Sequence, residues 1–250
     1  MISGASCWNQ SVQQGMSLVR AGDRDVYTFD AAEPTLYAQL AATAARTPDA
    51  VAIVDDWGHR TTFAQLKCYA DDLTGYLCAN ASVRAGDRVG LLMHADAEFA
   101  VAFYAISKAG CTCVPIPTKY REPEVASIAR AADLKALIMG EEFEPWRQSL
   151  PVRPSETVVA TNCEKGFGFP QAQGFAPVCE ACGGPDDAAI MMFTSGTTSG
   201  AKGVVLTNRN VVHATMVYQR LMGTTPADRC LIPIPIYHVT GLIALLAQFV

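Results

Sequence analysis

The sequence has few charged residues and no strong excess of either sign. Of its 250 residues, 17% are charged and 50% are hydrophobic, and the formal net charge is −5. A protein that binds a phosphate backbone normally carries a basic face, and the scattered lysines and arginines here predict none, so nucleic acid is disfavoured as a partner. The hydrophobic content also excludes a disordered chain.

The chain also lacks a secretory leader and an uninterrupted apolar span. No lysine or arginine precedes Arg20, and prolines or Lys108 interrupt the apolar stretches 99–117 and 231–250. Neither stretch offers the ~20 continuous apolar residues that a transmembrane helix needs. The nine cysteines are an odd number, which indicates a reducing compartment. We therefore expect a cytoplasmic chain with no transmembrane segment.

Cys179 and Cys182 have the spacing of half a zinc site. No second pair of ligands with such spacing accompanies them, so we interpret the two cysteines as loop thiols.

Helical and strand patterns alternate from about residue 35 onward. Helices are predicted over 35–46, 62–79 and 96–108 and from 122, and strands over 51–54, 87–93, 111–116, 134–139, 157–160 and 188–194. Thr62 and Gln65 have the spacing of a capping box. Because most strands read as continuous apolar runs, we predict an α/β fold with parallel sheets flanked by helices. Residues 1–34 show little periodicity and are interpreted as an N-terminal extension.

One segment is almost free of bulky side chains. The strand 188–194 leads into a run of Gly, Ser and Thr that ends at Lys202. Backbone N–H groups and hydroxyls in such a loop suit phosphate oxygens, and the lysine adds a positive charge. A flexible surface linker is the alternative, disfavoured because apolar runs flank the segment on both sides. The loop is not a Walker loop, because Ala201 and Gly203 occupy positions where that motif needs Gly and Ser or Thr.

The segment 194–204 resembles the phosphate-loop signature of the AMP-forming adenylating enzymes, which include acyl- and aryl-CoA synthetases, luciferases and peptide-synthetase adenylation domains. Two residues depart from that signature: Ser199 replaces the usual Gly and Ala201 the usual Pro. Further similar segments follow in the family's order, at 47–53, 62–66, 86–91, 98–115, 206–210 and 235–242. The resemblance therefore implies that residues 35–250 are the N-terminal part of an AMP-binding (adenylating) domain.

The resemblance also implies a chemistry. In this family the loop holds the β- and γ-phosphates of ATP while a substrate carboxylate attacks the α-phosphate, giving acyl-AMP and pyrophosphate, and a thiol such as CoA then displaces AMP. The resemblance implies a catalytic role for Lys202. It also implies a bound Mg²⁺, to which Thr194 would contribute a ligand. The implied ATP-binding residues are Thr194, Ser195, Gly196, Thr197, Thr198, Ser199, Gly200 and Lys202.

The segment 235–242 is similar to the family motif that lines the acyl pocket. The resemblance implies that His238 is a catalytic residue near the substrate carboxylate and that Gly241 contacts the substrate. The alternative for His238 is a core histidine, hydrogen-bonded within an apolar segment. Amino-acid-activating domains typically have Phe-Asp where this chain has Tyr237 and His238. A CoA ligase for a fatty or aryl acid is therefore favoured over an amino-acid adenylation domain, which stays the alternative.

Several later motifs of the family are absent from these residues: the adenine contact, the magnesium glutamate, the ribose aspartate, and the mobile domain with its catalytic lysine. We expect a fragment that is inactive alone. The alternative is a non-catalytic remnant or a half that a complementing C-terminal chain completes. The acidic pairs Asp55–Asp56 and Asp71–Asp72 are expected to be solvated charges on a turn and a helix face.

Overall fold

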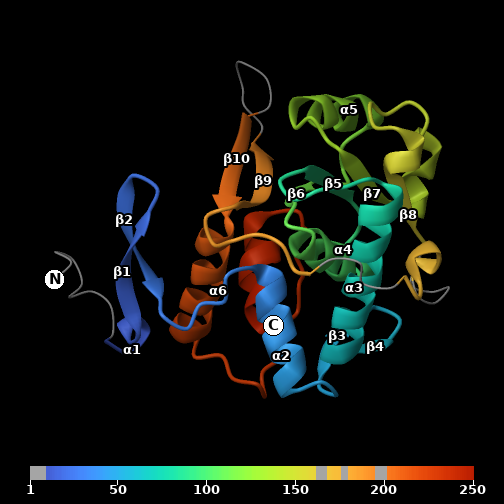
Figure 1. Cartoon of the computed structure of the whole chain (residues 1–250). Coiled ribbons are helices and arrows are strands. Elements are labelled where there is room, and N and C mark those ends of the chain that lie inside the picture. The colour runs from blue at the N-terminus through green and yellow to red at the C-terminus, as the bar shows by residue number, and fades with distance from the viewer. Residues whose placement is uncertain (1–9, 162–167, 176–179, 195–201) are drawn as a thin grey trace.

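A six-stranded sheet forms the centre of the computed structural model, which describes residues 10–161, 168–175, 180–194 and 202–250 (Figure 1). Its order is β10-β9-β6-β5-β7-β8. The strands are β5 (Arg88–Leu92), β6 (Thr112–Pro115), β7 (Ala136–Gly140), β8 (Thr157–Ala160), β9 (Ala188–Thr194) and β10 (Lys202–Thr207). The α/β prediction is confirmed, with one correction.

That correction concerns the edge strand β10. β6 pairs in parallel with β5 and β9, and β7 with β5 and β8, whereas β10 pairs antiparallel with β9. Only residues 195–201 connect β9 to β10. A parallel connection needs a crossover of a dozen or more residues, so this short link requires the chain to turn back beside β9.

Helices cover both faces of the sheet. The chain forms α2 (Leu36–Arg46), α3 (Phe63–Asn80), α4 (Ala97–Lys108), α5 (Glu122–Ala131) and α6 (Asn208–Met222). One core joins α2, α3, α4 and α6 to alternate strand residues such as Leu91 and Ile138. A second core joins α5 to the intervening residues, such as Leu92 and Leu137. The strands are therefore buried on both faces, as their continuous apolar runs predict.

Local signals set several helix starts. At the start of α3, the Thr62 hydroxyl accepts from the Gln65 amide at 3.2 Å, and the Gln65 side chain accepts from the Thr62 amide at 2.9 Å. The predicted capping box is confirmed. Asp96 caps α4 by accepting from the Phe99 amide at 3.1 Å.

The N-terminal segment is more ordered than its weak periodicity suggests. It contains α1 (Gln10–Gln13) and an antiparallel hairpin of β1 (Met16–Ala21) and β2 (Arg24–Phe29). Phe29 is buried, and its ring stacks on that of His213 in α6, with 5.1 Å between the two ring centroids. The Arg220 guanidinium lies 4.1 Å from the Phe29 ring centroid. The sequence pattern missed this hairpin because its stability comes from contacts with α6, about 190 residues further on.

The remaining elements are short. A second hairpin pairs β3 (Val51–Val54) with β4 (Arg60–Thr62). Short helices lie at η2 (Glu141–Trp146), η3 (Pro154–Glu156) and η5 (Pro170–Ala172), and the last residues form the π-helix η6 (Thr240–Leu246) and η7 (Ala247–Phe249).

The expectation that Asp71 is a solvated charge is wrong. Its carboxylate accepts hydrogen bonds from Tyr37 Oη at 2.6 Å and from Lys67 Nζ and Lys108 Nζ at 2.8 Å each. The side chains of Lys108 and Asp71 are only 6% and 14% exposed. Burial alone would raise the pKa of Asp71, but the hydrogen bonds from Lys108, Lys67 and Tyr37 outweigh it and lower that pKa. The pattern missed the network because α2, α3 and α4 each supply part of it.

Replacing Asp71 with Asn tests this network. The Lys108 ammonium would stay buried without its carboxylate, so we expect the free energy of unfolding at pH 7 to fall by about 3 kcal/mol. Because the folded-state pKa of Asp71 is lowered, its stabilisation is present above the unfolded-state pKa and is lost as pH falls through the folded-state value. Urea denaturation at pH 7 and at acidic pH measures both effects. Asp56→Asn, at an exposed turn residue, is the matched control, and equal stability of the two variants would contradict the account.

Candidate functional site

The predicted phosphate loop begins and ends at the carboxyl edge of the parallel sheet. β9 runs parallel to β6, and Thr194 at its end pairs across the ladder with Lys202 at the start of β10. Ligands of α/β sheets bind at this edge. The structure therefore brings Thr194 and Lys202 together there, with Lys202 exposed (Figure 1).

The other predicted loop residues, Ser195, Gly196, Thr197, Thr198, Ser199 and Gly200, lie outside the described residues. Their assignment to the ATP phosphates stays a prediction, as does the assignment of Thr194 to Mg²⁺. In the described part of the chain, no group of three or more His, Cys, Asp or Glu residues is arranged to hold a metal ion.

Contacts on the other side of β9 hold it in place. Ile190 pairs with Cys113 of β6, and the Thr112 hydroxyl donates to the Ala188 carbonyl at 3.2 Å. The segment before β9 is tied to the start of α6, where the Asn208 side-chain amide donates to the Gly184 carbonyl at 3.1 Å. The strand that leads into the loop is thus fixed at its amino end by both β6 and α6.

His238 does not lie in the core. It is exposed, and its backbone N–H donates to the Pro235 carbonyl at 3.1 Å. The ring lies 4.8 Å from the ring of buried Tyr237. The core-histidine alternative is therefore wrong. The side chains of His238 and Lys202 form no hydrogen bond or ion pair with the described residues.

Gly241 is buried at the start of the π-helix η6. A Cβ atom at this position would lie 3.0 Å from both the Ile236 Cα and the Pro235 carbonyl oxygen. A larger residue here would force the backbone of 235–236 to shift, because that backbone approaches Gly241 closely. This observation shows a packing role, while the predicted substrate contact stays a prediction.

A titratable cluster that the sequence interpretation missed follows β5 and β7 at the same edge. The pKa of Asp96 is raised to about 7 by burial, by the charge of Glu98 and, more weakly, by that of Glu142. Glu98 is buried, and His94 lies 3.5 Å from Glu142. The position of Asp96 before a helix was visible in the sequence. The carboxylates that oppose its ionisation meet it only in the folded chain.

Asp96→Asn separates the cost of this charge from the helix cap. Asn keeps an oxygen for the Phe99 amide but cannot ionise, so we expect it to raise the free energy of unfolding at pH 8.5 by about 2 kcal/mol. Because the pKa of Asp96 is raised on folding from 3.8 to about 7, the native state loses stability as pH rises between these two values. The gain should therefore be clearly smaller at pH 5 than at pH 8.5, and absent only below the unfolded-state pKa. Thermal denaturation at the two pH values measures it, and a variant less stable than the parent at pH 8.5 would contradict the assignment.

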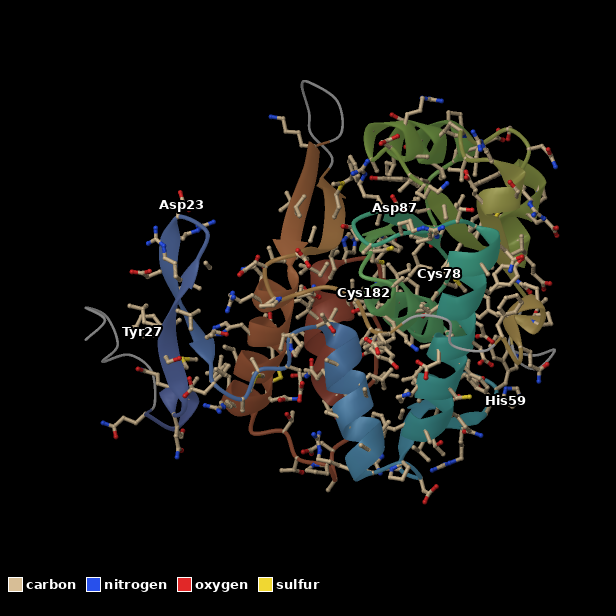
Figure 2. The ribbon with its side chains drawn as sticks, in the orientation of Figure 1. Asp23, Tyr27, His59, Cys78, Asp87 and Cys182 are labelled. Atoms are coloured by element: carbon tan, nitrogen blue, oxygen red, sulfur yellow. The ribbon has the colours of Figure 1, made fainter. Side chains whose placement is uncertain are left out.

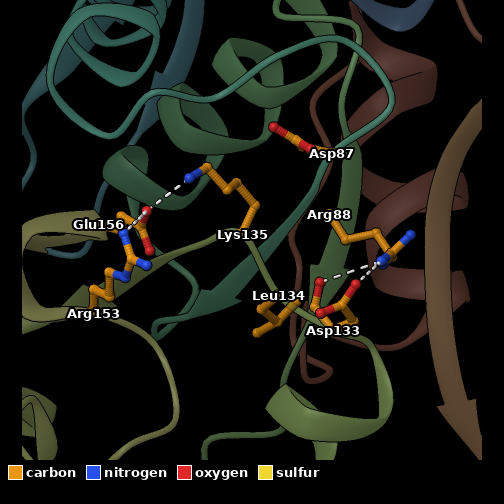
Figure 3. Close-up of a pocket in the computed structure, with 7 residues that line it drawn as sticks. All are labelled: Asp87, Arg88, Asp133, Leu134, Lys135, Arg153 and Glu156. Carbon is orange, nitrogen blue, oxygen red and sulfur yellow. Dashed lines mark hydrogen bonds and ion pairs between the residues drawn. The ribbon is translucent and has the colours of Figure 1, made fainter.

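A charged cavity of about 260 Å³ lies at the opposite, amino edge of the sheet (Figure 3). Its lining residues are Asp87, Arg88, Asp133, Leu134, Lys135, Arg153 and Glu156. Ion pairs of 2.6 Å join Arg88 to Asp133 and Lys135 to Glu156, and Arg153 lies 4.0 Å from Glu156. Each cation in this cavity thus already has a carboxylate neighbour. The cavity therefore lies at the edge of the sheet opposite to Lys202 and is not part of the candidate phosphate site.

Comparison with known proteins shows the family. The family model for AMP-binding enzymes matches residues 40–250, so the chain belongs to the AMP-binding enzyme family.

The described helices lack the combination of length and hydropathy that a membrane crossing requires.

Two relatives and one solved structure illustrate the match. The long-chain-fatty-acid–CoA ligase FadD13 of Mycobacterium tuberculosis is 33% identical over 187 residues, which are 73% of this chain and 37% of that protein. The nonribosomal peptide synthetase inpB of Emericella nidulans is 33% identical over 185 residues, which are 74% of this chain and 8% of that protein. The inhibitor-bound N-terminal domain of FACL13 from Mycobacterium tuberculosis superposes with a TM-score of 0.75 at 28% identity, covering 87% of this chain and 55% of that one.

These comparisons confirm the predicted family and fold. The chain corresponds to the N-terminal part of such an enzyme, and it spans 37% of the length of FadD13.

Proposed function

We propose that this chain is the phosphate-binding part of an AMP-forming acid–thiol (acyl-CoA) ligase, which converts a carboxylic acid to acyl-AMP and then to acyl-CoA. The observation that carries the proposal is the pairing of Thr194 with Lys202 at the carboxyl edge of the sheet, where a Gly/Ser/Thr segment joins them. Membership of the AMP-binding family supports ATP as the ligand. The odd number of cysteines, nine, favours action in a reducing compartment, the cytoplasm.

In this proposal the loop acts on the leaving group. The substrate carboxylate oxygen attacks the α-phosphorus, the bond to the bridging oxygen breaks, and negative charge accumulates on pyrophosphate. The loop amides and hydroxyls and the exposed Lys202 ammonium would stabilise that charge as it develops. Mg²⁺, when bound, would neutralise phosphate oxygens, with Thr194 as a contributing ligand. The thiol of CoA would then attack the acyl carbon, and AMP would leave.

The segment 235–242 would contribute to the acid site. The exposed ring of His238 lies beside Tyr237 and can donate a hydrogen bond to a carboxylate, while the absence of a side chain at Gly241 allows the close turn that presents it. A fatty or aryl acid is the substrate class we propose, in line with the fatty-acid specificity that the name of FadD13 states. The match to inpB keeps an amino-acid adenylation domain as the alternative. Parallel pyrophosphate-exchange assays with fatty, aryl and amino acids on the completed enzyme would separate the two.

Lys202→Ala tests the phosphate assignment. Removing the ammonium takes away one charge-assisted contact to the phosphates, so we expect the Kd for ATP to rise about tenfold, or by about 1.4 kcal/mol. Binding of a fluorescent ATP analogue to the purified chain at low salt measures it. Arg24→Ala removes an exposed cation from the distant hairpin and serves as the control. Equal affinities of both variants and the parent would refute the role of Lys202.

We also propose that a complementing C-terminal half packs against the open side of β10. Val204 and Val205 on this edge strand are 48% and 47% exposed, and Leu231 is 81% exposed. Exposed apolar edge strands of this kind are pairing sites for other polypeptide segments. The chain spans 37% of FadD13, which supports a second half of the same enzyme as the occupant.

Complementation distinguishes a catalytic half from a non-catalytic remnant. The chain alone should release no carboxylate-dependent pyrophosphate, and co-expression with the remaining C-terminal portion of a full-length relative should restore it. Val205→Lys should abolish the restored activity, because it places a charge in the proposed contact, while Val54→Lys on the separate exposed strand β3 should not. Pyrophosphate release by the chain alone would contradict the need for a partner. Failure of every pairing would favour the remnant.

A further inference from the structure

The β9–β10 pair of strands is joined to the rest of the sheet by few backbone contacts. The two strands pair with each other from Ala188 and Thr207 at one end to Thr194 and Lys202 at the other. In the described part of the sheet, β10 pairs with β9 alone, and the ladder between β9 and β6 consists of one residue pair at Ile190. The direction in which the strand pair leaves the sheet therefore depends largely on contacts at its base, near Ala188 and Thr207.

A set of hydrogen bonds, which we call the base clamp, joins residues 184–187 to the start of α6. The Asn208 side-chain amide donates to the Gly184 carbonyl at 3.1 Å, and the Asn208 backbone N–H donates to the Asp187 carbonyl at 3.0 Å. The backbone N–H of Arg209 donates to a carbonyl of the same turn at 2.6 Å. The base clamp thus connects the turn before β9 to the residues that follow β10.

The base clamp has a buried part and an exposed part. Asn208 is only 6% exposed. The Arg209 guanidinium donates to the Asp186 carboxylate in two bonds of 2.8 and 2.9 Å, a geometry that fixes orientation as well as distance. The Asp186 side chain is 53% exposed, and exposed ion pairs contribute little to global stability. The exposed pair can therefore be changed with little effect on folding.

Both sides of the base clamp are attached to the interior of the molecule. Cys182, labelled in Figure 2, lies before the turn, and its backbone N–H donates to the Lys108 carbonyl at 2.9 Å. The Lys108 side chain is itself held in the buried pair with Asp71. On the other side, Val211 and Val212 anchor the first turns of α6 in the core. The base clamp therefore holds the strand pair between two fixed supports.

Apolar packing does not replace these hydrogen bonds. Met191 and Phe193 of β9 pack against the core around α5. Such hydrophobic contact is non-directional, whereas the hydrogen bonds of the base clamp specify where each strand begins or ends. Because Thr194 and Lys202 lie at the far end of the strand pair, a small rotation at the base displaces them the most.

We propose that the base clamp positions Thr194 and Lys202 for phosphate binding, and that Asn208 and Arg209 are its positioning residues. Both residues lie at the opposite end of β10 from Lys202 and act through the strand pair. The proposal rests on the proposed phosphate site, because it assigns to these residues a role in forming that site.

Residual dipolar couplings of the ¹⁵N-labelled chain test the positioning role without ATP. In Asn208→Ala, the couplings of β9 and β10 should still fit one rigid unit, but this unit should no longer fit the alignment frame of β5 and β7. Arg209→Glu, which places two carboxylates together, should show the same change. The double variant Asp186→Arg with Arg209→Glu should restore the parent frame. An alignment frame that is unchanged in both single variants would overturn the proposal.

ATP affinity tests the consequence for the site. β10 alone spans about 16 Å, and charges are screened over about 8 Å at physiological salt, so reversing the charge of Arg209 has little direct effect at Lys202. We expect the Kd of a fluorescent ATP analogue to rise about threefold in Arg209→Glu and to return to the parent value in the double variant. Arg20→Glu, which breaks the exposed ion pair with Asp25 on the β1–β2 hairpin, is the matched control and should leave the Kd unchanged.

The two measurements separate this proposal from the proposed function. A parent chain that binds no ATP analogue would refute the phosphate site and, with it, the role of the base clamp. Binding by the parent with the same affinity in Asn208→Ala and Arg209→Glu would overturn the base clamp alone.

Discussion

The pairing of β9 with β6 is the contact on which the candidate site depends. It places the end of β9, and therefore Thr194 and Lys202, at the edge where the carboxyl ends of the parallel strands meet. The ladder is short, and the Thr112 hydroxyl, which donates to the Ala188 carbonyl, supports it. The positions of Thr194 and Lys202 at this edge therefore depend on a small number of contacts.

The position of β9 also depends on contacts with the helices α3 and α4, which pack on one face of the sheet. Lys108 ends α4, and its side chain is held in the buried pair with Asp71, while its carbonyl accepts from the Cys182 amide. The same short stretch of chain thus joins α3 to α4 through a side chain and α4 to the approach of β9 through its backbone. A disturbance of the ion pair would reach the approach to β9 through Lys108.

The sequence predicted the elements with a strong local signal and missed those that depend on distant partners. Continuous apolar runs such as 88–92 and 136–140 identified buried parallel strands, since both faces of such strands are covered. The capping residues of α3 identified its start, because the signal lies within four residues. The β1–β2 hairpin and the Asp71 network have no such local signal. Their stability depends on α6 in one case and on three converging helices in the other.

The features of the candidate site also differ in whether a local sequence signal predicts them. The Gly/Ser/Thr composition predicts a phosphate loop, and the placement of its flanking residues Thr194 and Lys202 at the carboxyl edge followed from the parallel sheet. The antiparallel return of β10 was not predicted, although the connection over residues 195–201 is too short for a parallel crossover. The raised pKa of Asp96 could not be anticipated either, since it arises from burial near Glu98 and Glu142.

The central claim is that ATP phosphates bind at the segment joining Thr194 to Lys202. The most direct measurement is a titration of the ¹⁵N-labelled chain with a non-hydrolysable ATP analogue, following the backbone amide shifts by NMR. The account predicts that the largest shifts fall between residues 194 and 203. Largest shifts at the opposite edge, around Arg88 and Lys135, would contradict it.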